Sequence, residues 1–146
     1  MKYRALAVLL LAGCAAQQPA PTEEAAKPPA VVPAAPVKEN VAIAGLMDSA
    51  RAEYAAGNFP NAAASLERAL RIEPRNPRLW HELARVRLKQ GQYAQAESVA
   101  ARSNSWAADD KALRAENWRL IAQAREARGD ADGARAALET AEKISH

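Results

Sequence analysis

The sequence of 146 residues contains few cysteines, histidines, glycines and aromatic residues. A single Cys excludes an internal disulfide, and two His residues exclude most metal sites that need several Cys or His ligands. Only 5% of the residues are aromatic, which is unfavourable for the strands of a β-sandwich. Alanine, in contrast, occurs 38 times. Because alanine has the highest helix propensity and a small side chain, this composition predicts closely packed helices.

The sequence also lacks the motifs of common catalytic sites. It contains no glycine-rich phosphate-binding loop, no nucleophile elbow and no HExxH zinc motif. His81 has no Cys or second His at ligand spacing, and the segment 130–133 lacks the third ligand and the closing Glu of a calcium loop. We interpret that segment as a turn followed by a helix N-cap. We therefore expect a protein that is not an enzyme and that uses neither a metal nor a cofactor.

The first thirteen residues have the features of a secretory signal peptide. Lys2 and Arg4 give a positively charged start, and an uncharged apolar run of eight residues follows at 5–12. Eight residues are too few for a helix that crosses a bilayer, which needs about 20. A basic start, a short apolar run and small residues after it predict a signal peptide at residues 1–13.

The residues after the apolar run indicate lipid attachment. The sequence Leu-Ala-Gly-Cys at 11–14 resembles a bacterial lipobox. The resemblance implies cleavage after Gly13, a diacylglycerol on the sulfur of Cys14 and acylation of the new amino terminus, and several acyl chains anchor a protein stably. Ala15 follows the cysteine, which by the sorting rule of Gram-negative lipoproteins implies an outer-membrane anchor and a domain that faces the periplasm. The alternative is a secreted protein with an unused thiol.

Cleavage also changes the charge balance. The mature chain loses Lys2 and Arg4 and keeps 18 basic and 17 acidic residues, so the net charge falls from +3 to +1. A balance so close to neutral gives no support for nucleic-acid binding.

Residues 14–42, which begin with the lipidated cysteine, form a predicted linker. Six of the nine prolines lie between Pro19 and Pro36, in a segment without an apolar period. Proline interrupts helices, and this composition cannot build a core, so we expect the segment to be disordered. In polyproline II conformation, at about 3.1 Å per residue, the roughly 26 residues from 15 to about 40 span about 80 Å. The linker is either a passive spacer or gives the domain the reach to meet a partner across the peptidoglycan.

From residue 43 onward the sequence repeats. Alanine- and leucine-rich stretches show the 3.6-residue period of amphipathic helices. Gly57, Gly91 and Gly129 each begin a similar turn signal; the first two are 34 residues apart, and the last two are 38 apart. A period of 34 residues with two helices per repeat is the signature of tetratricopeptide repeats (TPRs).

Residues 43–146 therefore resemble a TPR domain. The signature positions of the second repeat hold Trp80, Leu83, Ala84, Gly91, Tyr93 and Ala96. The resemblance implies an all-α, TPR-like solenoid of three helical hairpins (six helices), with repeats at 43–76, 77–110 and 115–146. The third repeat departs from the pattern, since Ala131 replaces the usual aromatic residue.

The extra residues between the last two repeats lie at 103–114. We expect Asp109 or Asp110 to cap a lengthened first helix of the third repeat. Trp106 lies in this connection, outside the repeat pattern. It either covers the edge of the core or anchors a partner, since Trp is enriched in interface hot spots.

Stacked hairpins of this type leave a concave surface lined by the first helix of each repeat. The concave positions of the family imply a partner-binding groove with Met47, Arg51, Tyr54, Arg78, His81, Arg85, Leu88, Lys89, Arg119 and Gln123. The middle of this groove is basic, so we expect an acidic or carboxylate-bearing peptide segment as ligand, with Tyr54 and Leu88 as apolar contacts. The alternative is a solvated face in an arginine-rich chain.

A lipidated cysteine, a proline-rich tether and a small repeat domain together resemble outer-membrane TPR lipoproteins, in particular the LpoP-type activators of class A penicillin-binding proteins. The resemblance implies a cofactor-free regulator that binds this peptidoglycan synthase in the periplasm and favours its active state. We expect a monomer that contacts the membrane only through its lipid anchor and binds no nucleic acid. Two alternatives stay open: a pilotin-like assembly factor for a secretin or pilus, and a structural envelope tether.

Overall fold

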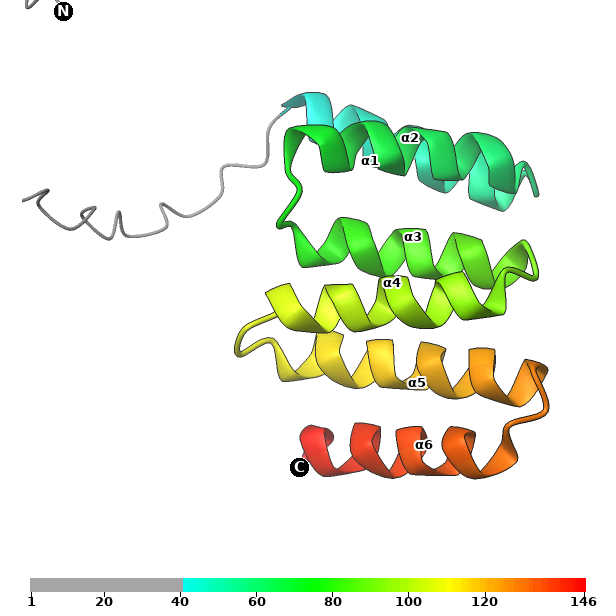
Figure 1. The fold of residues 1–146 in the computed structure, drawn as a ribbon. Coiled ribbons are helices and arrows are strands. Elements are labelled where there is room, and N and C mark those ends of the chain that lie inside the picture. Colours follow the sequence, from blue (N-terminus) through cyan, green and yellow to red (C-terminus); the bar gives the residue numbers. More distant parts are fainter. Residues whose placement is uncertain (1–40) are drawn as a thin grey trace, which may run out of the picture. The chain divides into compact units, whose positions relative to one another are not determined.

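The computed structural model describes residues 41–146. Six α-helices follow one another in this part of the chain: α1 (Val41–Ala55), α2 (Phe59–Ile72), α3 (Pro77–Lys89), α4 (Tyr93–Trp106), α5 (Lys111–Ala127) and α6 (Ala131–Ser145). Consecutive helices run antiparallel, and the three hairpins that they form are stacked in a row (Figure 1). The predicted all-α fold of six helices is confirmed.

The predicted signal peptide, Cys14 and the proline-rich segment lie outside the described residues. The first helix begins at Val41, two residues before the domain boundary that the sequence predicts. Among residues 41–146, every helix is too short or too polar to span a bilayer.

The turn inside each hairpin contains a glycine in the left-handed region. The φ angles of Gly57, Gly91 and Gly129 are 78°, 74° and 83°. A residue with a side chain pays roughly 1–2 kcal/mol for this conformation, so the repeated glycine spacing of the sequence is the spacing of the hairpin turns. The connection between the first two hairpins is built differently. Asn76 caps α3 by accepting a hydrogen bond from the backbone N–H of Arg78 at 3.0 Å.

Asp110 ends the connection between the last two hairpins and caps α5. Its Oδ1 accepts a hydrogen bond from the backbone N–H of Leu113 at 3.0 Å, which confirms the predicted cap at this residue. Helix α5 has 17 residues and begins at Lys111, four residues before the predicted start of the third repeat, because the cap lies earlier. Asp130 caps α6 in the same way by accepting from the N–H of Gly133 at 2.9 Å, which confirms the interpretation of segment 130–133.

Alanine forms much of the contact between helices. Six alanines have no exposed surface: Ala62, Ala69, Ala84, Ala96, Ala100 and Ala124. Larger apolar side chains gather in two adjoining groups, one around Leu66 and Leu79 and one around Leu120 and Ile121. Helix α3 contributes buried residues to both groups, so it joins the first and third hairpins into one continuous stack. The face formed by α1, α3 and α5 is thereby held in a fixed shape.

Candidate functional site

Helices α1, α3 and α5, the first helix of each hairpin, line a face with three hollows among the described residues. The central hollow shares Met47 and Arg51 with the hollow on one side. It shares Arg85 with the hollow on the other side. The three hollows therefore form one interrupted groove. The side chains of Arg51 and Arg85 lie between adjacent hollows.

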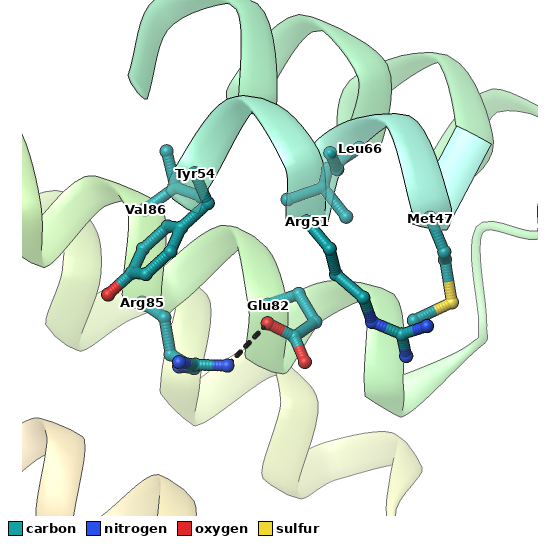
Figure 2. A pocket seen from close by; sticks show the side chains of 8 residues that line it. Met47, Arg51, Tyr54, Leu66, Glu82, Arg85 and Val86 are labelled. Atoms are coloured by element: carbon teal, nitrogen blue, oxygen red, sulfur yellow. Dashed lines mark hydrogen bonds and ion pairs between the residues drawn. The ribbon is translucent and has the colours of Figure 1, made fainter. Parts of the chain in front are cut away.

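The central hollow has a volume of about 170 Å³. Figure 2 shows Tyr54 and Arg85 on one side of it and Met47 on the other, with Arg51 and Glu82 between them. Its apolar lining consists of Met47, Ala50, Leu66 and Val86. A cavity of about 150 Å³ with such a lining accepts a benzene molecule, so this hollow has room for one apolar side chain.

Charged groups surround the central hollow in fixed positions. Arg85 donates a hydrogen bond from Nη1 to Oε2 of Glu82 at 2.8 Å, and its guanidinium carbon lies 5.1 Å from the ring centroid of Tyr54. Tyr54 in turn packs edge-to-face on Phe59, with a centroid distance of 5.5 Å. The arginine is therefore oriented by a carboxylate and by an aromatic ring before any ligand arrives.

The largest hollow lies near the edge of the domain where α1 and α3 begin. It has a volume of about 690 Å³ and is lined by Met47, Arg51 and residues 73–78 of the connection between α2 and α3. Arg51 Nη1 lies 3.3 Å from Asp48 Oδ1, and Arg78 Nη2 lies 3.6 Å from Asp110 Oδ2. The side chains of both arginines are largely exposed. These two ion pairs are solvent-screened and leave the arginines available to a ligand.

The third hollow lies between α3 and α5 and has a volume of about 320 Å³. Its lining residues are His81, Arg85, Glu116, Arg119, Leu120 and Gln123. Within residues 41–146, Arg119 forms no ion pair. This hollow therefore adds to the groove a cation without an ion-pair partner, together with the carboxylate of Glu116.

A buried polar network holds His81 in place below the third hollow. Its Nδ1 lies 2.9 Å from Oδ1 of Asn117, and because an amide oxygen only accepts, Nδ1 is the donor. Asn117 is fully buried and donates to Ser103 Oγ at 2.7 Å and to Asn104 Oδ1 at 2.9 Å. The other ring nitrogen of His81, Nε2, lies 3.8 Å from Glu116 Oε2.

Two comparisons with known proteins agree with this architecture. The tetratricopeptide repeat family matches residues 53–116. The solved structure of the globular C-terminal domain of P. aeruginosa LpoP is 47% identical in sequence to this chain, and the TM-score is 0.69. The match covers 70% of this chain and 97% of the solved domain. The chain belongs to the LpoP family. Its predicted resemblance to LpoP-type TPR proteins is confirmed, and the domain is a protein-interaction module of the LpoP type. No curated protein matches the chain.

The structure brings most of the predicted groove residues of this LpoP-type domain together. Met47, Arg51, Tyr54, Arg78, His81, Arg85, Arg119 and Gln123 each line at least one hollow. Leu88 is half-buried and packs against the second core group, and Lys89 is exposed at the end of α3. Neither of these two residues lines a hollow. The groove is therefore shorter than predicted on the side where α3 ends.

Acidic residues of the groove were missed by the sequence analysis. Glu82 lines the central hollow, and Glu73 lines the largest one. The spacing of Glu82 three residues before Arg85 is the signal that identifies such a pair on a helix. Asn117 was also missed, because a single polar residue in an apolar pattern does not reveal its partners on other helices. Within residues 41–146, no group of three or more His, Cys, Asp or Glu is placed to hold a metal ion.

Trp106 ends α4 and is 40% exposed, with the guanidinium of Arg75 over its ring. It lines none of the three hollows. It therefore adjoins the groove through Arg75 without lining a hollow itself.

Proposed function

We propose that this protein is a periplasmic regulator that binds a class A penicillin-binding protein and favours the active state of this peptidoglycan synthase. The observation that supports the proposal most is the 47% identity to LpoP over 97% of the solved LpoP domain. The protein acts by binding, without catalytic chemistry of its own and without a cofactor.

The groove is the proposed contact with the synthase. Its apolar central hollow, bordered by Arg51 and Arg85, suits a partner segment with an apolar residue flanked by carboxylates. Hydrogen bonds from arginine to carboxylate are about twice as strong as neutral ones. Activation requires only that the segment be better presented in the active conformation of the synthase, because a ligand shifts an equilibrium by its differential affinity for the two states.

The proposed location is the periplasmic face of the outer membrane, with the lipid on Cys14 as the anchor. The lipobox at residues 11–14 and Ala15 after it support this location. The linker then carries the groove away from the membrane toward a synthase on the other side of the cell wall.

The partner is tested by affinity capture from a detergent extract of the cell envelope. The bait is the mature chain from residue 14 with Cys14→Ser, and a second bait carries Arg51→Glu and Arg85→Glu in addition. The proposal expects a class A penicillin-binding protein on the first bait and at least about tenfold less on the second, since each arginine hydrogen bond to a carboxylate contributes roughly 1.5–3 kcal/mol. Recovery of a secretin alone contradicts the proposal and favours a pilotin-like assembly factor. Recovery of only other envelope proteins favours a structural tether.

A further inference from the structure

Two arginine–tryptophan pairs lie at the edge of the domain where α1, α3 and α5 begin (Figure 1). The guanidinium carbon of Arg75, in the connection between α2 and α3, is 5.2 Å from the ring centroid of Trp106 at the end of α4. The guanidinium carbon of Arg102 is 5.2 Å from the ring of Trp80 in α3. Arg75 also lines the largest hollow of the groove, whereas Trp80, Arg102 and Trp106 line none of the three hollows.

The two pairs are joined into one surface. Arg102 and Trp106 are four residues apart on α4 and therefore lie on the same side of that helix. Trp80 donates a hydrogen bond from Nε1 to the carbonyl oxygen of Pro74, the residue before Arg75, at 2.8 Å. We call Arg75, Trp80, Arg102 and Trp106 the arginine–tryptophan surface.

This surface combines uncompensated positive charge with exposed apolar groups. Arg75 and Arg102 are exposed, and neither forms an ion pair within residues 41–146. Trp106 is 40% exposed, and Ile72, the last residue of α2, is 48% exposed.

Two carboxylates of the adjoining connections, those of Glu73 and Asp110, have partners outside the surface. Glu73 accepts a hydrogen bond from Asn76 Nδ2 at 2.8 Å. Asp110 caps α5 with its Oδ1, and its Oδ2 lies 3.6 Å from Nη2 of Arg78. The surface therefore fits a partner that supplies negative charge and an apolar layer together.

We propose that the arginine–tryptophan surface docks on an anionic membrane surface. Tryptophan and arginine are the side chains that occupy the boundary between headgroups and acyl chains, where the ring is buried and the guanidinium meets phosphate. Val41 begins α1 at this same edge of the domain (Figure 1), so the chain that carries the predicted anchor enters here.

The anchor makes weak docking sufficient. Only 26 residues separate Cys14 from Val41. A linker of this length keeps the domain at a high effective concentration near the bilayer, so a surface of low affinity is still occupied. Docking and release then give the domain two positions, one on the membrane and one extended toward the cell wall. This proposal depends on the predicted anchor and is independent of the identity of the protein partner.

The test uses the mature chain with Cys14→Ser, which has no lipid, and vesicles of phosphatidylglycerol and phosphatidylethanolamine. The amount of protein that sediments with the vesicles is expected to rise with their phosphatidylglycerol fraction and to fall as the salt concentration rises. With vesicles of pure phosphatidylcholine, no protein is expected to sediment. Arg75→Glu with Arg102→Glu is expected to weaken binding at least about 20-fold, since each basic residue contributes roughly fivefold near an anionic surface. Trp106→Ala is expected to weaken binding as well.

The control is Lys89→Glu with Arg135→Glu, which changes the net charge equally near the opposite edge of the domain, where α3 ends and α6 begins. It is expected to leave binding within about twofold of the parent. Arg75→Gln with Arg102→Gln replaces the first variant if circular dichroism shows that the charge reversals unfold the domain. The proposal is overturned if the parent does not bind phosphatidylglycerol vesicles, or if the two double variants lose binding equally. It is also overturned if the surface binds purified cell-wall sacculi or an acidic protein and not the vesicles.

Discussion

The guanidinium of Arg85 lies over the ring of Tyr54, with 5.1 Å between its central carbon and the ring centroid. The two residues belong to α3 and α1, so their contact joins the first helices of neighbouring hairpins across the groove. Glu82 accepts a hydrogen bond from the same guanidinium at 2.8 Å. A cation that is already ordered loses little conformational entropy when a ligand binds, which favours affinity.

Replacing Arg85 tests the groove as the contact with the synthase. Arg85→Glu is expected to weaken binding of a purified class A penicillin-binding protein by about 10- to 100-fold, because a charge-assisted hydrogen bond is lost and a carboxylate is opposed. The matched control is Arg135→Glu on α6. Arg135, like Arg85, is paired with a carboxylate three residues earlier. Isothermal titration calorimetry measures the dissociation constant of each variant for the synthase. Equal affinities of the two variants contradict the assignment of the groove as the contact.

The buried network below the third hollow is expected to contribute to stability. Asn117→Ala removes the hydrogen-bond partner of His81 Nδ1 and of Asn104 Oδ1, so the free energy of unfolding is expected to fall by about 1–3 kcal/mol. Gln123→Ala, on the exposed side of the same helix, is expected to change it by less than about 0.5 kcal/mol. Urea denaturation followed by circular dichroism measures both. A loss for Asn117→Ala no larger than for Gln123→Ala shows that the network does not stabilise the fold.

Two glycines in open space are expected to respond to alanine with opposite signs. A Cβ at Gly45 or at Gly57 meets no atom within 4 Å. Gly45 lies within α1, so Gly45→Ala is expected to raise the free energy of unfolding by about 0.5–1 kcal/mol. Gly57 has a φ of 78°, so Gly57→Ala is expected to lower it by about 1–2 kcal/mol. Thermal unfolding measures the Tm of each variant. Shifts of the Tm in the same direction for both variants contradict this explanation of the hairpin turns.

The lipid anchor is tested in cells. Cys14→Ser is expected to move the protein from the outer-membrane fraction to the soluble periplasmic fraction or to leave it as uncleaved precursor, because no acyl chain is attached. Fractionation and the mass of the mature amino terminus are the measurements. An unmodified wild-type cysteine in the outer-membrane fraction contradicts the anchor. Ala15→Ser at the neighbouring position serves as the control.

The fold was predictable because its signals are local. The hairpin turns need a left-handed residue, so Gly57, Gly91 and Gly129 mark them in the sequence. The period of the apolar residues indicates the helices between these turns. The cap of α5 was predictable to within one residue, because Asp is a preferred cap in front of a helical segment.

The groove was predictable only in part. Its basic residues follow from repeat positions, but the burial of Leu88 against the second core group depends on how the hairpins pack. The pairing of Trp80 with Arg102 joins residues that are distant in the sequence, and no local pattern identifies it. Contacts of this kind depend on the crossing of helices, which a period does not specify.

The central claim is most directly tested by the rate of glycan polymerisation. A class A penicillin-binding protein from the same organism is assayed with lipid II, with and without the mature chain carrying Cys14→Ser. The account predicts a faster rate with the mature chain, a saturating dependence on its concentration, and little or no stimulation by the variant with Arg51→Glu and Arg85→Glu. A rate that is unchanged at saturating concentrations of the mature chain, with binding confirmed in the same buffer, contradicts it.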